Sequence, residues 1–285
     1  MVDVCGDFVA LGDYMGTKIY VLNSEGFKGE IETTLAVQRF CVAGNGNVAV
    51  VLEEDDVTWV KLFNVNGEDI ANDRTTMAKS GYPISIDISE DGILLSVSYL
   101  YIDSGEISSS VAYYNFGSVG QNEIDNLVSG YNYPDEVITY TGFMNNDTSF
   151  ALGSSHLEIF KGDQKPENVA DIELDDEVSG VFYGKNNIGL VYATGTLDAP
   201  YEVDVYDKDG QLVLSQPFDL EYTDIVFNKD LVIIYNSSEC VIYNLEGVQK
   251  YKGLFKNSIL DLISTSTKTK YLLVSGGKTD EIQLR

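Results

Sequence analysis

Short runs of β-branched and aromatic residues alternate with polar turn clusters along most of the chain. The pattern is clearest between Ile225 and Gly247, where apolar runs at 225–227, 231–235 and 240–243 are separated by Asn, Asp, Ser and Lys. Apolar runs of this length, bounded by turn-forming residues, are typical of strands joined by tight turns. The pattern therefore predicts an antiparallel meander.

A turn marker recurs along the chain, an aromatic residue or leucine followed by a polar turn that ends in glycine. It occurs at Leu22–Gly26, Phe63–Gly67, Tyr114–Gly117, Tyr206–Gly210 and Tyr243–Gly247, with a degenerate copy at Phe160–Gly162. The final glycines are 37 to 50 residues apart. A second polar marker, between the first two predicted strands of units two to seven, keeps step with the first and lies at 44–47, 89–92, 145–147, 184–187, 228–230 and 266–268.

Two markers with a common period of about 40–50 residues and four short strands per period indicate the blades of a β-propeller. A β-sandwich would also show closely spaced strands, but it would not show this two-marker period. We therefore predict an all-β fold, a single-domain seven-unit β-propeller of four-stranded antiparallel blades over residues 1–285. The units begin near Val2, Val37, Tyr82, Glu136, Asp176, Glu221 and Ser258.

The predicted propeller is of the general WD-repeat and quinoprotein type but lacks the sequence marks of either class. The Gly-His and Trp-Asp pairs of WD repeats are absent, and Trp59 is the only tryptophan, whereas tryptophan-docking quinoproteins need one in each blade. The segment Asp207–Gly210 holds only two of the carboxylates of a calcium loop, so we interpret it as a hairpin turn.

The last unit is predicted to be incomplete. We interpret Glu281–Arg285 as its third strand, and Val2 begins the first strand of the first unit. Many propellers pair strands from both termini, which removes exposed sheet edges. The sequence thus predicts a three-stranded last unit or an incompletely closed propeller, with the partner strand upstream of Met1.

The third and fourth units depart most from the repeat. The segment Tyr101–Glu106 predicts a hairpin. Ile124, Leu127 and Val128 fall at helical spacing before a glycine that can cap a helix, which predicts a short helix over 121–130. We interpret Tyr131–Asp135 as a loop between the two units.

The segments Ser98–Gly105 and Tyr114–Asp125 resemble an uncharacterised bacterial β-propeller family, a domain of unknown function found in Gram-positive anaerobes. The stretches at 79–84, 160–166 and 237–243 agree with it. The resemblance covers the whole chain and implies an extracytoplasmic propeller that an amino-terminal membrane helix anchors in typical members. This chain departs from the family by showing neither that helix nor the usual segment upstream of the first blade. The family brings no known activity, ligand or catalytic residue.

The composition excludes several classes of function. Lys and Arg number 18 against 45 Asp and Glu, a formal net charge of −27, which repels nucleic acid and anionic lipid surfaces. No apolar run is long enough to insert in a membrane, and the acidic amino terminus is not a signal peptide. We interpret Cys5, Cys41 and Cys240 as small apolar residues inside strands, because three scattered cysteines form no disulfide framework.

The candidates for catalysis and metal binding are weak. His156 is the only histidine, and we interpret it as a solvated residue at the start of a strand. The acidic clusters Glu53–Asp56 and Glu173–Glu177 match no calcium-loop spacing, so we interpret them as solvated tips or connections. No metal, cofactor or catalytic residue is predicted.

The tyrosines carry the main functional signal. Eight of the 19 lie between Tyr82 and Tyr140. A tyrosine offers a flat apolar face and a polar tip, which suit a sugar ring or a peptide, although residues such as Tyr99 and Tyr101 can equally fill space between sheets. Loops between propeller units commonly carry ligands. The predicted binding residues are Tyr82, Tyr131, Tyr133 and Asp135.

We predict a monomeric, extracytoplasmic binding or scaffolding module whose ligand is a protein or a glycan. The alternative is a glycan-active hydrolase or lyase that uses channel carboxylates, and a third hypothesis is a sensor domain that recognises a neighbouring protein. An enzyme should bring two or three carboxylates with raised pKa values together in a pocket. A binding module should show exposed tyrosines and no such group of carboxylates.

Overall fold

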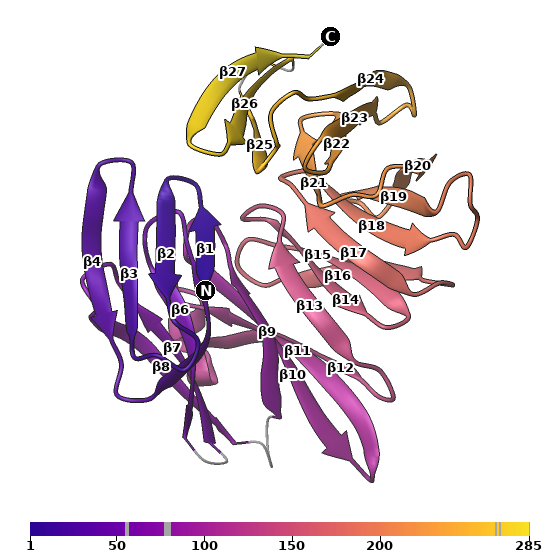
Figure 1. Cartoon of the computed structure of the whole chain (residues 1–285). Coiled ribbons are helices and arrows are strands. Elements are labelled where there is room, and N and C mark those ends of the chain that lie inside the picture. Colours follow the sequence, from indigo (N-terminus) through magenta and orange to yellow (C-terminus); the bar gives the residue numbers. More distant parts are fainter. Residues whose placement is uncertain (55–56, 77–80, 266, 268, 285) are drawn as a thin grey trace. The chain divides into compact units, whose positions relative to one another are not determined.

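The computed structural model describes residues 1–54, 57–76, 81–265, 267 and 269–284. They form seven antiparallel sheets, in each of which consecutive strands pair (Figure 1). The chain divides into two compact units, Met1–Asp175 with four sheets and Asp176–Arg285 with three. Each sheet is a blade, and the predicted seven-bladed β-propeller fold is confirmed.

The first unit contains blades 1 to 4. Blade 1 consists of β1 (Val2–Cys5), β2 (Phe8–Gly12), β3 (Lys18–Asn23) and β4 (Gly26–Glu32). Blade 2 consists of β5 (Ala36–Val42), β6 (Val48–Glu54), β7 (Val57–Phe63) and β8 (Asp69–Thr76). Blade 3 consists of β9 (Tyr82–Ile88), β10 (Leu94–Asp103), β11 (Glu106–Asn115) and β12 (Leu127–Tyr133). Blade 4 consists of β13 (Ile138–Phe143), β14 (Thr148–Gly153), β15 (His156–Lys161) and β16 (Glu167–Glu173).

The second unit contains blades 5 to 7. Blade 5 consists of β17 (Val178–Tyr183), β18 (Asn187–Ala193), β19 (Tyr201–Asp207) and β20 (Leu212–Phe218). Blade 6 consists of β21 (Asp224–Asn228), β22 (Leu231–Tyr235), β23 (Glu239–Asn244) and β24 (Gln249–Leu254). Blade 7 consists of β25 (Asp261–Ser264), β26 (Lys270–Ser275) and β27 (Lys278–Gln283).

The turn markers of the sequence lie at equivalent places in the blades. The first marker forms the turn between the third and fourth strands, where Gly67, Gly210 and Gly247 have φ angles of 79°, 77° and 75° that favour glycine. The second marker joins the first and second strands, from 44–47 between β5 and β6 to 228–230 between β21 and β22. Its last copy, at 266–268, lies outside the described residues.

The core lies between successive sheets within each unit. The second strand of most blades is buried along its whole apolar run, as in Val48–Leu52 of β6 and Leu231–Tyr235 of β22. Carboxylates on innermost strands add cross-links between neighbouring blades. Asp3 accepts the backbone N–H of Val42 at 2.6 Å, and Asp87 accepts that of Phe143 at 2.6 Å.

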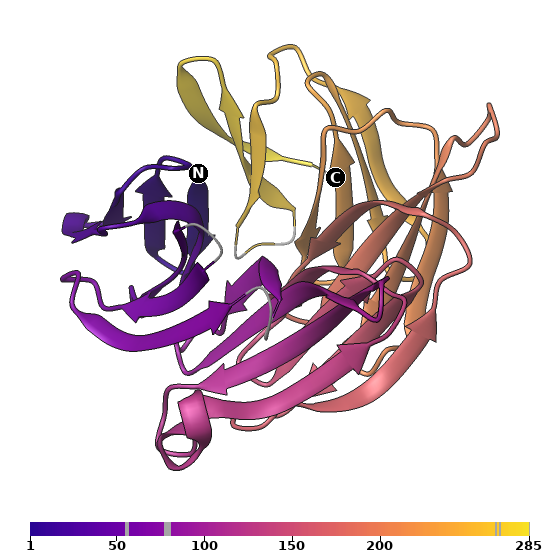
Figure 2. The same ribbon diagram turned by 90° about the horizontal axis from the view of Figure 1, so that it is seen from below.

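The predicted helix over 121–130 is wrong. The chain makes two single 3-10 turns, Gly120–Asn122 and Ile124–Asn126, drawn in magenta in Figure 2, and residues from Leu127 onward belong to β12. Asp125 and Asn126 have φ angles of 56° and 59°, which a continuous helix does not allow. The pairing of Leu127 with Tyr114 on β11 overrides the local helical spacing.

The prediction of a three-stranded last unit is confirmed for the described residues. Blade 7 holds β25, β26 and β27, and β27 pairs with β26 alone. The β27 sequence, Lys-Thr-Asp-Glu-Ile-Gln, is mostly charged or polar, as is usual for a strand at a sheet edge.

The cysteines all lie in strands. Cys41 and Cys240 are buried, as expected of small apolar residues, whereas Cys5 is half-buried, and all three thiols are free. Within the described residues, no helix is long and apolar enough to cross a membrane.

Candidate functional site

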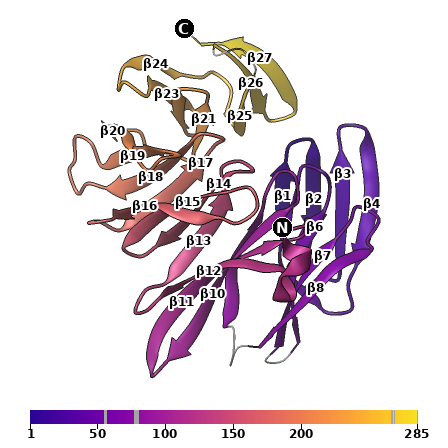
Figure 3. The same ribbon diagram turned by 180° about the vertical axis from the view of Figure 1, so that it is seen from behind.

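The two central strands of blade 3 extend beyond its two edge strands at one end. These central strands, β10 and β11, have ten residues each and are the longest strands among the described residues. β9 pairs with β10 only as far as Leu100, opposite Tyr82, and β12 pairs with β11 only as far as Ser109, opposite Tyr133. Beyond these pairs, among the described residues, Tyr101–Ser108 continues as a two-stranded ribbon (Figure 3), called the ribbon below.

The ribbon has an apolar face and an acidic face. Ile102 lies opposite Ile107, and their side chains are 75% and 55% exposed. Asp103 lies opposite Glu106 on the other face, because successive residues of a strand point to opposite sides. A two-residue turn at 104–105, with positive φ at both positions, closes the ribbon, so the predicted hairpin is confirmed.

The apolar face of the ribbon lies on the side of blade 4. Ser109, two residues after Ile107 and on the same face, donates its hydroxyl to the carbonyl of Glu136 at 2.8 Å. The hydroxyl oxygen of Ser109 also accepts the N–H of Ile138 at 3.0 Å. The ribbon therefore leaves the sheet where the connection between β12 and β13 passes its base.

Tyr82, the first predicted binding residue, lies at the base of the ribbon as the first residue of β9. Its side chain is half-buried, and its hydroxyl donates to Glu53 of blade 2 at 3.2 Å. Burial raises the pKa of Tyr82, and the negative charge of Glu53 raises it further. The acidic cluster to which Glu53 belongs continues to 55 and 56, which lie outside the described residues.

Tyr131 and Tyr133 lie in strand β12 and not in the predicted loop. β12 runs to Tyr133 because Tyr131 pairs with Val111 and Tyr133 pairs with Ser109 across the ladder. The loop between blades 3 and 4 is therefore shorter than predicted and begins at Pro134.

The two tyrosines pack between blades 3 and 4. Tyr133 is 7% exposed, and its hydroxyl donates to Glu158 at 2.7 Å. Tyr131 is half-buried, its ring centroid lies 4.7 Å from that of Phe160, and its hydroxyl donates to the carbonyl of Pro166 at 2.9 Å. Burial raises the pKa of both tyrosines. The hydroxyls thus have partners within the protein.

Asp135 is the exposed member of the predicted set. It lies in the connection between β12 and β13 with a φ of 59°. The next residue, Glu136, folds back on blade 4, where it accepts the N–H of Ser155 at 3.0 Å and the hydroxyl of Ser155 at 2.8 Å. The structure therefore brings Tyr131, Tyr133 and Asp135 together, while Tyr82 lies at the opposite edge of the same sheet.

His156 begins β15, as the sequence predicts, and lies beside Glu136. Its Nδ1 atom is 3.1 Å from the Glu136 carboxylate, and its side chain is 37% exposed. Burial lowers the pKa of His156, but the hydrogen bond to Glu136 and the charges of Glu136, Asp171 and Glu173 outweigh it, so the pKa is raised. Ser155 contacts the same Nδ1 atom at 3.0 Å, so Nδ1 faces both partners and the ring does not link a nucleophile to a carboxylate through its two nitrogens.

The carboxylates with raised pKa values already have partners. Burial raises the pKa of Asp3, whose carboxylate accepts the N–H of Val42. Burial also raises the pKa of Glu158, which accepts the hydroxyl of Tyr133 and, at 2.8 Å, the amide of Asn168. Among the described residues, no group of three or more His, Cys, Asp or Glu could hold a metal ion. The cluster at 173–177 spans the end of β16 and the connection that follows.

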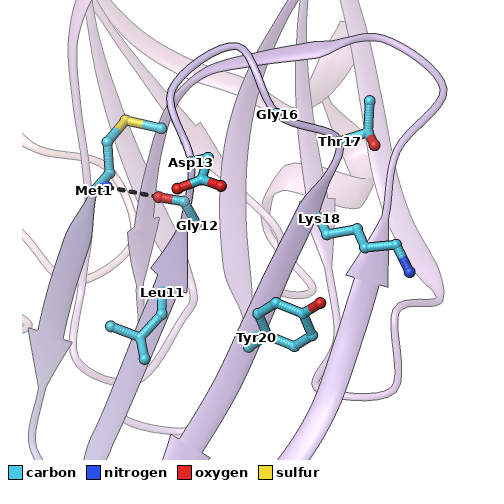
Figure 4. A pocket seen from close by; sticks show the side chains of 8 residues that line it. All are labelled: Met1, Leu11, Gly12, Asp13, Gly16, Thr17, Lys18 and Tyr20. Atoms are coloured by element: carbon cyan, nitrogen blue, oxygen red, sulfur yellow. Dashed lines mark hydrogen bonds between the residues drawn. The ribbon is translucent and has the colours of Figure 1, made fainter.

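A pocket of about 420 Å³ lies on blade 1 (Figure 4). Its lining residues are Met1, Leu11, Gly12, Asp13, Gly16, Thr17, Lys18 and Tyr20. The Met1 amino group donates to the carbonyl of Gly12 at 2.6 Å, and Lys18 forms an ion pair with Glu30. Asp13 is the only carboxylate side chain in the lining, so this pocket does not hold the pair that a glycosidase needs.

The sequence reading missed the exposed isoleucines of the ribbon and the partners of the tyrosines. The symmetric run Ile102-Asp-Ser-Gly-Glu-Ile107 was a usable signal, because a two-residue turn places its two isoleucines opposite each other. Glu158 and Pro166 carry no such signal, since each lies more than 20 residues from the tyrosine that it contacts.

Comparison with known proteins supports the fold. The solved structures that resemble this chain include Sqt1 of Chaetomium thermophilum bound to the N-terminus of ribosomal protein L10, with a TM-score of 0.60, 12% identity, and coverage of 94% of this chain and 78% of that chain. The WD40 domain of Neurospora crassa Pan2 gives a TM-score of 0.57 and 10% identity, covering 96% and 84%. BamB of Moraxella catarrhalis gives a TM-score of 0.51 and 13% identity, with coverage of 96% of this chain and 81% of that chain.

The sequence comparisons assign the chain to a family but not to an activity. The model of a family of unknown function, DUF5711, matches residues 1–284. No curated protein matches the chain.

Proposed function

The chain belongs to this family of unknown function, and we propose from its geometry that it is a non-enzymatic scaffold that binds a partner protein. The partner docks at the end of blade 3 that carries the ribbon, the predicted residues Tyr82, Tyr131 and Tyr133, and the exposed Asp135. The observation that carries the proposal is the ribbon itself, which extends beyond both neighbouring strands and exposes Ile102 and Ile107.

A regular blade does not need this extension in order to pack. Departures from a repeat scaffold are usually loops on one face, and such loops often bind partners. Exposed apolar side chains that lie side by side cost free energy in water, and a bound partner recovers it. The ribbon therefore has the properties of a docking element rather than of a core element.

The tyrosines support this end of the blade from within. Tyr131 and Tyr133 fix β12 against blade 4, and Tyr82 fixes β9 against blade 2, each through its hydroxyl. A contact element held on a rigid base loses less conformational entropy when it binds. In this proposal the tyrosines hold the base of the ribbon, and Asp135 is the member of the set that faces the partner.

The alternative, a glycan-active hydrolase or lyase, has weaker support. Its general acid would be Glu158, whose pKa burial raises, but Tyr133 and Asn168 already occupy that carboxylate. The Sqt1 structure, in which a propeller of similar fold binds the N-terminus of another protein, supports a protein partner over a glycan. We include two further points in the proposal. The protein acts as a monomer. It acts outside the cytoplasmic membrane, which protease treatment of intact cells would test.

A photo-crosslinking amino acid tests the proposal most directly. Placed at Ser154, an exposed position next to Ser155 in the turn between β14 and β15, it lies near the proposed docking end. Placed at Glu123, an exposed position in the connection from β11 to β12, it lies at the opposite end of blade 3 and serves as a control. We expect a discrete protein adduct from position 154 only. Equal adducts from both positions, or none from either, would contradict the proposed function.

A further inference from the structure

We propose that the ribbon binds an extended, cationic segment of a partner protein, whose aliphatic side chains cover Ile102 and Ile107. This inference rests on the proposed function and adds the chemistry of the partner. Three features of the described residues support it: an apolar face, an acidic surrounding and an unpaired strand edge.

The apolar face needs a partner with aliphatic side chains. Ile102 and Ile107 lie directly opposite each other and together form one continuous surface, with the half-buried Leu100 next to it on the same face. Burial of apolar surface of this kind is the main favourable contribution to association. A purely polar peptide or a highly charged ligand would leave this surface exposed to water.

The charges around the ribbon require the partner to be cationic. The segments 101–108, 133–138 and 171–175 carry Asp103, Glu106, Asp135, Glu136, Asp171, Glu173 and Asp175 and contain no Lys or Arg. Among the described residues, His156 is the basic side chain that contacts these acids, through Glu136, and Arg39 lies near Tyr82 on the blade 2 side.

Two of these acids lie in an unfavourable arrangement. Asp103 and Glu106 face each other across the ribbon, and within the described residues neither forms an ion pair. Like charges directly opposite each other on a sheet are destabilising. A lysine or arginine of a partner strand on the edge of β11 would lie beside them and offset this repulsion.

The backbone of the ribbon favours an extended segment over a helix. Among the described residues, the edge of β11 from Glu106 to Ser108 has no neighbouring strand, because β12 ends at Tyr133. Pro134 follows and has no N–H group with which to continue the ladder. An incoming extended segment can therefore add to this edge and place alternate side chains on the isoleucine face.

Binding of designed peptides to the whole chain tests the inference. The probes are fluorescent eight-residue peptides in which lysine alternates with isoleucine, lysine with serine, or glutamate with isoleucine. We expect the Lys/Ile peptide to bind at least tenfold more tightly than either of the others, as measured by fluorescence anisotropy at physiological salt. Equal binding of the Lys/Ser peptide would overturn the proposal, because it would show attraction by charge alone.

A pair of variants assigns the binding to the ribbon. The double substitution I102S/I107S should weaken Lys/Ile binding tenfold or more. The control I124S changes an isoleucine that is 85% exposed at the other end of blade 3 and should leave binding within twofold. Equal losses in both, or no loss in I102S/I107S, would overturn the proposal.

Charge reversal provides a second test that does not remove the apolar face. D103K/E106K should lose affinity for the Lys/Ile peptide and gain affinity for the Glu/Ile peptide, and unchanged preferences would contradict the inference. The Ser154 crosslinking assay separates this inference from the proposed function. A crosslinked partner that persists in I102S/I107S means that the ribbon proposal fails while the scaffold function stands.

Discussion

The boundary between blades 3 and 4 in the first unit differs in chemistry from the boundary between blades 6 and 7 in the second unit. Between blades 3 and 4 the ring of Phe160 packs against the rings of Tyr113 and Tyr131, with centroid distances of 5.4 Å and 4.7 Å. Between blades 6 and 7 the buried cluster is mainly aliphatic, with Ile233, Ile242 and other branched residues. The boundary nearest the ribbon therefore relies more on packed rings, whereas the other relies mainly on aliphatic side chains, with Tyr235 and Tyr271 among them.

The hydrogen bonds differ in the same way. Tyr113 bonds Ser149 at 2.9 Å, Tyr131 bonds Pro166, and Tyr133 bonds Glu158, so three tyrosines of blade 3 are fixed by blade 4. Between blades 6 and 7, the Tyr235 hydroxyl donates to Asp261 at 3.1 Å, and within blade 6 it donates to Asp224 at 3.2 Å. Directional contacts fix orientation better than apolar contacts do, which suits a sheet that must hold a ribbon in one position.

Removal of the central ring between blades 3 and 4 should have the largest effect. Phe160 is fully buried, so F160A should cost about 3–5 kcal/mol of unfolding free energy through the cavity that it leaves. I233A, at the aliphatic boundary, should cost about 2–5 kcal/mol and is the matched control. Denaturant unfolding would measure both. F160A, unlike I233A, should also weaken binding of the Lys/Ile peptide, and an equal effect on binding would remove the distinction between the two boundaries.

Loss of one hydroxyl should have a smaller effect. Y133F removes a 2.7 Å hydrogen bond to the half-buried carboxylate of Glu158 and should cost about 1.5–3 kcal/mol, as is usual for bonds to charged groups. Y235F removes longer hydrogen bonds, of 3.1 Å to Asp261 and 3.2 Å to Asp224, whose exposed carboxylates water can solvate instead, and should cost about 1 kcal/mol. Thermal midpoints of the two variants under one condition test this order. A reversed order would show that hydroxyl contacts do not distinguish the boundaries.

Glu158 should make the stability of the first unit depend on pH. Burial raises its pKa, so the folded state holds the proton more tightly than the unfolded state. Its contribution to the unfolding free energy is therefore greatest at low pH and falls as pH rises from the usual range of a carboxyl group through the raised value. Relative to the wild type, E158Q should therefore become more stable as pH rises from 4 to 7. A difference that stays constant would contradict this account.

His156 should have the smallest effect. Its pKa is raised, so its stabilising contribution is present below about 6.5 and is lost as pH rises through the higher folded value. The side chain is 37% exposed, so solvent screening limits the effect to roughly 0.5 kcal/mol. H156N should therefore be less stable than the wild type at pH 5.5 and equal to it at pH 8.5. An equal loss at both values would mean that the histidine acts by packing.

The repeat could be predicted from sequence because its signals are local. Turns such as Phe63–Gly67 and Tyr243–Gly247 depend on a glycine with positive φ a few residues after an apolar strand. Strands such as Leu231–Tyr235 depend on short apolar runs between turns. Signals of this kind need no knowledge of distant residues.

The site could be predicted only in part because its contacts are distant in sequence. Ile124, Leu127 and Val128 have helical spacing, but pairing with β11 draws the last two into a strand, and Ile124 is left 85% exposed. Tyr131 and Tyr133 lie in a strand and not in the predicted loop for the same reason, since they pair with Val111 and Ser109 of β11. The Tyr101–Glu106 hairpin was predictable because its turn is local, although nothing local shows that the neighbouring strands end before it.

Hydrogen–deuterium exchange of the whole chain, with and without the Lys/Ile peptide, tests the central claim most directly. The account predicts that the peptide slows exchange in Tyr101–Ser108 and in the adjacent connection at 134–137. The 3-10 turns at 120–126, at the other end of the same blade, should exchange as before. Protection that falls on those turns, or that spreads evenly over both units, would contradict the claim that the ribbon is the docking element.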